Sequence, residues 1–389
     1  MEFYFYSPTK IYFGQGVRKK AGKAAVSIGK KCLIVRTPFK DRGREKYFEE
    51  ITASLKENDI QYAIFDQVKP NPTTDMVNSG IGVARKEKVD FIIGYGGGSS
   101  LDTAKAIALF TKNEALSWEE CFQRFSDPFA NNAEAAEMLP VIAITTTSGT
   151  GSQVTQAAVI TDSESNDKMT IFHPDLIPEI GLIDPELMLT VPKRATAITG
   201  FDALSHAMES YLNPRASNLT KSLSLQAIEM IVDALPELLN DLQNMELRKK
   251  LAYADTVAGI CLSNAGAEAP HPIGEIINGY YPDLAHGETL AFVYPTYFDY
   301  VSGIAPDKMS ELLIIFKNYV PKNSERFGEK AAGTLINFLK AIELDASLYT
   351  LEMPESIAEA IRKKLVFNLP LTNAENLQKI FNESLQQKN

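Results

Sequence analysis

Three of the four histidines in this sequence stand in short motifs that could hold a metal ion. Asp202 and His206 are four residues apart, a spacing that puts a carboxylate and an imidazole on the same face of a helix. Alone, this pair could form a local hydrogen bond, but His271 and His286 lie in two further compact motifs. One carboxylate and three imidazoles suit Fe(II) or Zn(II) better than Mg(II), which prefers oxygen ligands. We therefore predict that Asp202, His206, His271 and His286 bind one metal ion, whereas His173 has no ligand spacing and is expected to be structural.

Three consecutive glycines, Gly96, Gly97 and Gly98, are followed by Ser99 and separate an apolar segment from an expected helix. Glycines let a backbone approach an anion closely, and the N–H groups at a helix start point toward such an anion. The order of apolar segment, glycines and helix therefore predicts a phosphate-binding turn. The pattern is not GxGxxG, so the usual dinucleotide fingerprint is absent, and a tight turn without a ligand is the alternative.

Hydroxyl groups are concentrated in a second segment, 145–152, which also follows an apolar run. Its residues Thr146, Thr147 and Thr150 could form hydrogen bonds with a pyrophosphate or a ribose. Alone, the segment could equally be a flexible polar loop. Beside a glycine turn at the end of a neighbouring parallel strand, it would form the second wall of a dinucleotide crevice.

Both loops need a parallel sheet to hold them, and the first half of the chain has the pattern of one. Short apolar segments rich in β-branched residues alternate there with segments of helical periodicity, as in βαβ units. The expected strands are 32–35, 62–65, 91–94 and 141–145, and the expected helices are 44–58, 74–86 and 100–111. A β-hairpin is expected at 158–161 and 169–172.

The second half of the chain has a different sequence pattern. From about residue 186 onward, helical patterns follow one another and strand signals nearly disappear. We predict an N-terminal α/β domain, residues 1–184, with a parallel Rossmann-like sheet, and an all-helical C-terminal domain, residues 185–389. The glycine turn falls in the first domain and the metal motifs in the second. A cleft between two unlike domains is a common place for a ligand.

The composition indicates a globular protein that acts on a small molecule. Hydrophobic residues make up 45% and charged residues 23% of the 389 residues. A net charge of −10 repels nucleic acid and anionic lipid, so we expect neither as a partner. Cys32, Cys121 and Cys261 form no disulfide framework, and neither an export signal nor a membrane span is visible, so we expect a cytoplasmic location.

The sequence resembles the iron-containing, or group III, alcohol dehydrogenase family over nearly its whole length. The matching motifs occur in the family's order: 8–14, 71–73, 96–99 with Asp102 and Lys105, 146–152, and Asp202 with His206. The resemblance implies a dehydroquinate synthase-like architecture, a dimer or larger oligomer with a homodimer preferred, and the four metal ligands given above. It also implies that Asn71 and Lys168 contact the cofactor. For Lys168, a solvated lysine in a turn is the alternative.

The activity that the resemblance implies is hydride transfer between NAD(P) and a small primary alcohol or aldehyde. The metal would act as a Lewis acid on the alcohol oxygen. Fe(II) is expected, with Zn(II) possible, because their ligands overlap. Two alternatives stay open: a lyase of the dehydroquinate synthase type, and a noncatalytic nucleotide-binding protein. The lyase reaction needs several basic side chains, and the sequence around His271 contains no Lys or Arg.

Glu275 and Gln153 are departures from the family pattern. Glu275 stands four residues after His271, where many members carry a further histidine. If Glu275 faces the cleft, it could relay the alcohol proton, and it is our catalytic candidate for that reason. If it faces solvent it is an ordinary helix carboxylate, which the sequence alone slightly favours. Gln153 stands where a Glu usually follows the threonine segment.

The choice between NAD and NADP depends on the end of the first expected strand of the crevice. No acidic residue stands directly after 32–35, where a ribose 2′-hydroxyl would be bound. Thr37 is the cofactor-binding candidate at this position. The basic residues that could meet a 2′-phosphate are Arg36, Lys40, Arg42 and Arg44. We lean to NADP, with Asp41 as the counterargument.

Overall fold

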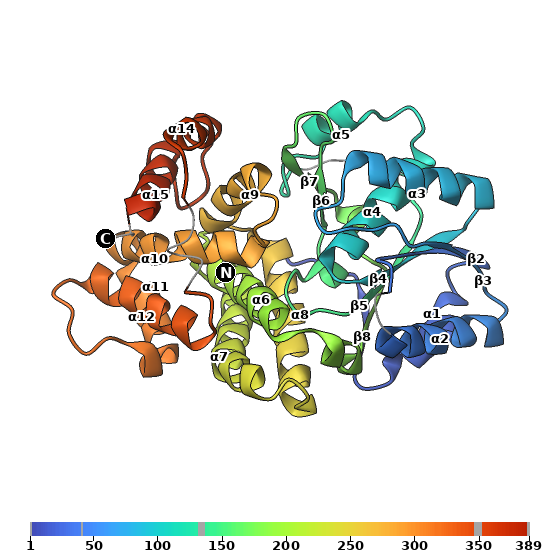
Figure 1. Cartoon of the computed structure of the whole chain (residues 1–389), viewed down its shortest axis with the longest axis horizontal. Coiled ribbons are helices and arrows are strands. Elements are labelled where there is room, and N and C mark those ends of the chain that lie inside the picture. The colour runs from blue at the N-terminus through green and yellow to red at the C-terminus, as the bar shows by residue number, and fades with distance from the viewer. Residues whose placement is uncertain (1, 40–41, 131–136, 346–351, 387–389) are drawn as a thin grey trace.

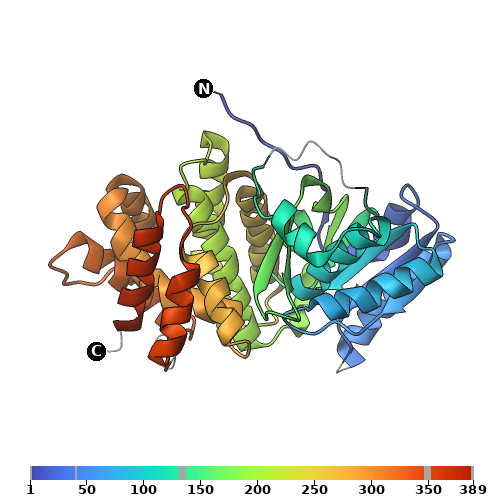
Figure 2. The same ribbon diagram turned by 90° about the horizontal axis from the view of Figure 1, so that it is seen from above.

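Two unlike halves make up the molecule (Figure 1). The computed structural model describes residues 2–39, 42–130, 137–345 and 352–386. Every strand of the described chain lies before residue 184, and the described elements from Lys193 onward are helices. The predicted fold class, a parallel sheet followed by a helical region, is confirmed. Figure 2 shows the two halves side by side, with the N-terminal arm extending from the body of the molecule.

The central sheet has six parallel strands in the order β1-β8-β5-β4-β2-β3. Their bounds are β1 Lys10–Phe13, β2 Lys31–Arg36, β3 Gln61–Phe65, β4 Phe91–Gly96, β5 Val141–Thr145 and β8 Ile180–Ile183. Strands β2 to β5 confirm the four predicted strands. Strands β1 and β8 were not predicted.

The side chains of β2 alternate between two hydrophobic clusters, because successive residues of a strand point to opposite faces. Cys32 and Ile34 pack on the face covered by α1 (Ala21–Ala25) and α2 (Arg42–Glu57). Leu33 and Val35 pack on the face covered by α3 (Thr74–Glu87) and α4 (Gly98–Lys112). The sheet is therefore buried on both sides, as parallel sheets require, and the three predicted helices are confirmed.

The predicted hairpin is also confirmed, as the antiparallel pair β6 (Ala157–Thr161) and β7 (Lys168–Phe172). Short elements complete this half: the helix α5 (Trp118–Arg124) and the 3-10 turns η1 (Val17–Lys20), η2 (Ser152–Val154), η3 (Pro174–Leu176) and η4 (Pro185–Thr190). In η3 the His173 ring accepts a hydrogen bond from the Asp175 N–H (3.1 Å). This buried histidine therefore caps a turn, in keeping with its expected structural role.

The helical half packs around α6, which is buried along most of its length. Its elements are α6 Lys193–Leu212, α7 Asn218–Asn240, α8 Met245–Ala265, α9 Pro270–Tyr280, α10 His286–Ile304, α11 Pro306–Ile315, η5 Lys317–Tyr319, α12 Phe327–Ala341, α14 Glu355–Lys364 and α15 Ala374–Gln386. Across the described ranges, no helix has the length and apolarity needed to span a bilayer.

Several polar contacts join the two halves. The backbone of Tyr6, in the N-terminal arm, exchanges two hydrogen bonds with the Asn264 amide on α8 (2.7 and 3.0 Å). Asn71 donates from Nδ2 to the Pro282 carbonyl, in the loop between α9 and α10 (3.1 Å). The cleft between the halves is therefore held at several points, and its geometry is set by contacts between distant parts of the chain.

Candidate metal centre and dinucleotide cleft

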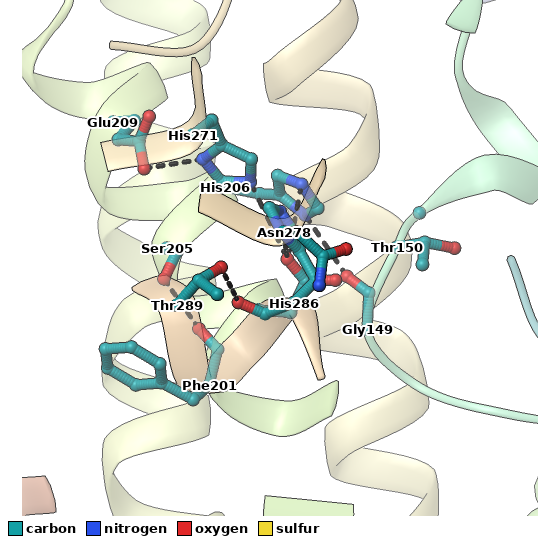
Figure 3. Close-up of polar contacts among 12 residues, drawn as sticks. Gly149, Thr150, Phe201, Ser205, His206, Glu209, His271, Asn278, His286 and Thr289 are labelled. Carbon is teal, nitrogen blue, oxygen red and sulfur yellow. Dashed lines mark hydrogen bonds and ion pairs between the residues drawn. The ribbon is translucent and has the colours of Figure 1, made fainter. Parts of the chain in front are cut away.

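The four predicted metal ligands converge on one carboxylate oxygen. The Asp202 Oδ1 atom lies 3.7 Å from His206 Nε2, 3.6 Å from His271 Nε2 and 3.9 Å from His286 Nε2. Helix α6 supplies the first two residues, α9 begins one residue before His271, and His286 opens α10. Figure 3 shows the three imidazoles gathered beside the threonine segment. The structure therefore brings Asp202, His271 and His286 together as one possible metal-binding group and places His206 beside Asp202; the four-residue ligand set stays a prediction.

These residues fit a divalent transition-metal ion. Asp202 Oδ1 and His271 Nε2 are both buried, and neither has a hydrogen-bond partner within the described chain. Buried polar atoms are seldom left without a partner, because the cost of removing them from water is then not offset. Ligand atoms of Asp202, His271 and His286 lie within 4.8 Å of one another. The oxygen and the imidazole nitrogens of this group, with His206 beside Asp202, are a donor set that suits iron or zinc.

The second ring nitrogen of two of these histidines is held by the protein. His206 Nδ1 lies 3.1 Å from the Gly149 carbonyl oxygen, and His271 Nδ1 lies 2.6 Å from Glu209 Oε1. Because both partners are acceptors, each Nδ1 donates, and each Nε2 is directed toward Asp202. These contacts fix the orientation of two ligand rings, and the first also joins the metal site to the threonine segment.

Burial and neighbouring charges shift the pKa values of this group strongly. Burial lowers the pKa of His206 and that of His286, which favours the neutral imidazole that a metal requires. Burial opposes ionisation of Asp202, but the surrounding histidines outweigh it and bring the Asp202 pKa to about 2. Burial also opposes the charged form of His271, yet Glu209 and Asp202 outweigh it and raise the His271 pKa to about 10. A metal ion at Nε2 would take the place of that proton.

The glycine turn and the threonine segment lie against each other, because β4 and β5 are neighbours in the sheet. The Thr146 N–H donates to the Gly96 carbonyl (2.9 Å). A Cβ atom added at Gly98 would lie only 2.5 Å from Thr150 Cγ2, so the two loops are in close contact. Ser99 is in the first turn of α4, where backbone N–H groups have no partner within the helix. The structure therefore assembles both walls of the predicted crevice.

Asp102 and Lys105, both on α4, fix the position of the threonine segment and of the chain that follows it. The Asp102 carboxylate accepts hydrogen bonds from the Ser152 hydroxyl (2.7 Å) and the Val159 N–H (3.1 Å). The fully buried Lys105 ammonium donates to the Thr155 carbonyl (2.8 Å) and to the Ala157 carbonyl (2.8 Å). Both family motif residues therefore tie α4 to the segment that runs from the threonine loop into β6.

A depression lies where β2 ends. Its lining contains three predicted cofactor residues and consists of Thr37, Phe39, Arg44, Tyr47, Tyr95, Gly96, Thr146, Leu187 and Thr190. None of these described lining residues carries a carboxylate, and Asp41 lies outside the described residues. The place of the depression at the end of β2 suits the adenosine end of a dinucleotide.

Arg36 was predicted as a candidate to bind a 2′-phosphate, but its side chain makes other contacts in the structure. Its guanidinium carbon lies 3.9 Å from the Phe39 ring centroid and 4.8 Å from that of Phe48. The same group donates to the Thr37 carbonyl (3.0 Å) and lies 3.4 Å from Asp66 Oδ2. This side chain is buried and engaged, because the aromatic residues that follow β2 fold over it. Lys40 and Asp41 lie outside the described residues, as does the Arg42 side chain, so Arg44 is the described candidate that lines the depression.

Lys168 is not a solvated turn lysine. It begins β7, and its ammonium donates to Asn278 Oδ1 on α9 (2.9 Å), across the boundary between the two halves. Burial lowers the pKa of Lys168, while Glu275 and Asp202 act in the opposite direction. Asn278 is positioned in turn by donating to the Leu284 carbonyl (2.6 Å), just before His286. Lys168 therefore stands at the metal side of the cleft.

Glu275 lies one turn after His271 on α9 and is only partly exposed. Burial raises the pKa of Glu275, whereas the charges of Lys168 and His271 lower it. Glu275 is therefore partly shielded from solvent, and its role as a proton relay stays a prediction. Asn71 donates to the Pro282 carbonyl, as described above. Among the described residues, no hydrogen bond joins it to the glycine turn.

Glu209 is a residue of the site that the sequence analysis did not identify. It is fully buried, and it contacts His271 from the side opposite the cleft. Its position was visible in the sequence, since Glu209 follows Asp202 by two helical turns and His206 by three residues. A carboxylate on the same helix face as two expected ligands is a signal for a residue that supports the metal site.

Comparisons with known proteins agree with this arrangement. The family model described as iron-containing alcohol dehydrogenase matches residues 8–185, and the model of that family's C-terminal region matches residues 196–384. The NAD-dependent methanol dehydrogenase of Bacillus methanolicus is 37% identical over 284 residues, which is 73% of this chain and 72% of that protein. The choline dehydrogenase of Bacillus subtilis is 33% identical over 349 residues, 90% of this chain and 84% of that protein.

Solved structures show the same architecture. A crystal structure of 1,3-propanediol oxidoreductase superposes with a TM-score of 0.86 at 26% identity, covering 99% of this chain and 100% of that one. The alcohol dehydrogenase of Oenococcus oeni superposes with a TM-score of 0.85 at 27% identity, covering 98% of this chain and 100% of that one.

Proposed function

The chain belongs to the iron-containing alcohol dehydrogenase family, and on that premise we propose that it transfers a hydride between NAD(P) and a small primary alcohol or aldehyde. Its relatives are alcohol dehydrogenases, and the chain is accordingly an oxidoreductase that acts on CH–OH groups. The observation that carries the finer proposal is the convergence of three imidazoles on Asp202 Oδ1, within 3.6–3.9 Å. The lyase alternative has no comparable support.

The chemistry follows from what the residues can hold. When bound, iron or zinc held by the four ligands supplies Lewis acidity toward an alcohol oxygen, and a nicotinamide supplies the hydride acceptor. The glycine turn and the threonine hydroxyls bind and orient the dinucleotide phosphates and ribose. Gly149, which accepts from His206, keeps the threonine segment next to the metal ligands. The protein thus positions the alcohol carbon near the cofactor and excludes water from the cleft.

One experiment tests this activity directly. Purified protein is assayed for oxidation of NADH and NADPH with a panel of small aldehydes, before and after chelation and after reloading with iron or zinc. We expect activity that is lost on chelation and restored by metal. The Asp202→Asn variant should keep the fold but lose activity and metal together, because the shared ligand oxygen loses its charge. Activity that is insensitive to chelation would contradict the proposal.

We propose further that Glu275 relays the alcohol proton. Its position one turn after His271, its desolvation and the nearby Lys168 charge support this role, because a carboxyl group with a raised pKa can exchange protons near neutral pH. Glu275→Gln should lower kcat and change the pH–rate profile. The exposed helix carboxylate Glu246 provides the control, as Glu246→Gln. A Glu275→Gln profile identical to that of the unmodified enzyme would exclude the relay.

For the cofactor, we propose a preference for NADP. The presence of Arg44 in the lining of the β2 depression supports this choice, and none of the described lining residues carries a carboxylate. A 2′-phosphate would gain a charge-assisted contact from that guanidinium. Arg44→Met should therefore raise KM for NADPH much more than KM for NADH. An equal change for both cofactors would argue for a role of Arg44 outside 2′-phosphate recognition.

A further inference from the structure

A fully buried carboxylate, Glu209, lies directly behind the ligand His271 (Figure 3). Its Oε1 atom lies 2.6 Å from His271 Nδ1 and accepts a hydrogen bond from the Tyr294 hydroxyl at 2.9 Å. Its Oε2 atom accepts from the Glu268 backbone N–H at 2.7 Å. Three hydrogen-bond donors therefore surround this one carboxylate.

The contacts of Glu209 connect the helices that carry the predicted metal ligands. Glu209 is on α6 with Asp202 and His206, while Glu268 N belongs to the segment that enters α9 and leads to His271. Tyr294 is on α10, the helix that His286 opens. One carboxylate therefore joins the three helices that carry the four ligands, and it contacts both the ring of His271 and the backbone just before it.

This contact also decides the state of the His271 ring. A carboxylate oxygen can only accept, so Nδ1 must carry the hydrogen, and the Nε2 atom is directed at Asp202 Oδ1, 3.6 Å away. A carboxylate on the second nitrogen also increases the basicity of the imidazole as a ligand. With Asp202, Glu209 supplies two negative charges at the site, which balance the charge of a divalent cation.

We propose that Glu209 is a positioning residue of the metal centre, which sets the tautomer, orientation and donor strength of His271. The proposal rests on the metal-dependent function proposed above. Loss of the Glu209 charge should weaken metal binding by about 10–100-fold, the usual effect of removing a group that orients a ligand histidine. A residue that served only to pack the core would change stability without changing metal affinity.

The test compares metal affinity among full-length variants. The dissociation constants of zinc and cobalt are measured by competition with a coloured chelator, the absorption spectrum of the cobalt form is recorded, and the metal-free proteins are melted. We expect Glu209→Gln to bind both metals about 10–100-fold more weakly and to show a shifted cobalt spectrum. The metal affinity of Glu209→Asp should lie between those of the unmodified protein and Glu209→Gln, because this variant keeps the charge but has a shorter reach to His271.

A matched control separates this role from packing. Glu268→Gln changes a buried carboxyl group near Glu209 but keeps the backbone N–H that donates to it, so this variant should bind metal nearly as the unmodified protein does. Glu209→Gln and Glu209→Asp proteins with unchanged affinity and spectrum would overturn the proposal, even if they melt earlier. If Glu209→Gln does not fold, Glu209→Asp alone decides. If the unmodified protein binds no stoichiometric ion, the metal-dependent function fails first, and the variants are not needed to show it.

Discussion

The buried carboxyl groups near the metal centre differ in charge because their neighbours differ. The Asp202 carboxylate faces three imidazoles, which hold its pKa at about 2 against the effect of burial. Burial raises the pKa of Glu268 to about 8, and the neighbouring Glu209 charge acts in the same direction. Glu268 is fully buried, and its Oε2 has no hydrogen-bond partner in the described chain. At neutral pH a buried carboxyl group is therefore ionised at Asp202 and protonated at Glu268.

The state of Glu268 predicts a pH dependence of stability. Its pKa is about 8 in the folded protein and near its ordinary value of 4.5 when unfolded, so the folded state binds the extra proton between these values. The stabilisation is fully present below the lower value and is lost as pH rises toward the upper one. One such group gives a slope of about 1.4 kcal/mol per pH unit. Glu268→Gln should reduce the pH dependence of the free energy of unfolding between pH 5 and pH 8, measured by urea titration. An unchanged slope would show that other groups cause this pH dependence.

Among the structural elements, the threonine segment is the one that connects the two halves most closely. His206 contacts its Gly149 carbonyl, and Asp255 on α8 accepts from the Gly151 N–H (3.0 Å). Gln153 reinforces this by donating to the other Asp255 oxygen (2.8 Å). An amide at position 153 suits this contact, because it can donate where the carboxylate usual in the family could not. The segment predicted to contact the cofactor is therefore held by the helical half as well as by α4.

Gly151 is required at its position by backbone conformation and by close packing. Its φ of +61° is left-handed, and an added Cβ would lie 2.6 Å from Gly259 Cα on α8. We expect Gly151→Ala to lower the free energy of unfolding by about 1–3 kcal/mol, as overpacking does, and to weaken dinucleotide binding measured by calorimetry. Gly82→Ala on α3, where nothing lies within 4 Å, is the control and should gain about 0.5–1 kcal/mol. Equal effects of the two changes would contradict this account.

At the scale of the whole molecule, a cluster centred on Arg18 holds the chain where the sheet half leads into the helical half. The buried Arg18 guanidinium contacts Asp184 at the end of β8 (2.7 Å), Glu50 on α2 (2.6 Å), and Glu186 in η4. Asp184 is itself fully buried. The start of the chain is thereby joined to the segment that enters α6, and through α6 to the metal ligands.

Removing this cation should be costly, because it leaves the fully buried Asp184 carboxylate without its counter-charge. We expect Arg18→Met to lower the free energy of unfolding by about 3–5 kcal/mol, in chemical denaturation at pH 7. The neighbouring Lys19, which is 58% exposed and 3.6 Å from Glu50, is the matched control. Lys19→Met should change stability by less than about 0.5 kcal/mol. A small effect at Arg18 would show that water reaches the cluster.

Local spacing in the sequence was sufficient to predict the motifs that carry the chemistry. The Asp202/His206 pair, the glycine turn and the alternating strands and helices of the first half depend on residues close together in the chain. Helical and extended periodicities place such residues on one face or at one turn whatever surrounds them. The structure confirms the predicted strands and helices of the first half and shows where these motifs lie, while the cofactor choice and the substrate stay proposals.

Only the tertiary structure decided which charges are buried and what they meet. Glu209 contacts His271 across 62 residues of sequence, and Arg36 is covered by the aromatic rings that follow β2. Glu275 is half-buried, and burial raises its pKa. The four ligands themselves come from α6 and from the starts of α9 and α10, and no local pattern brings those helices to one point. Their convergence depends on hydrophobic packing of the helical half, a non-directional force summed over many distant contacts, and sequence spacing does not encode such a sum.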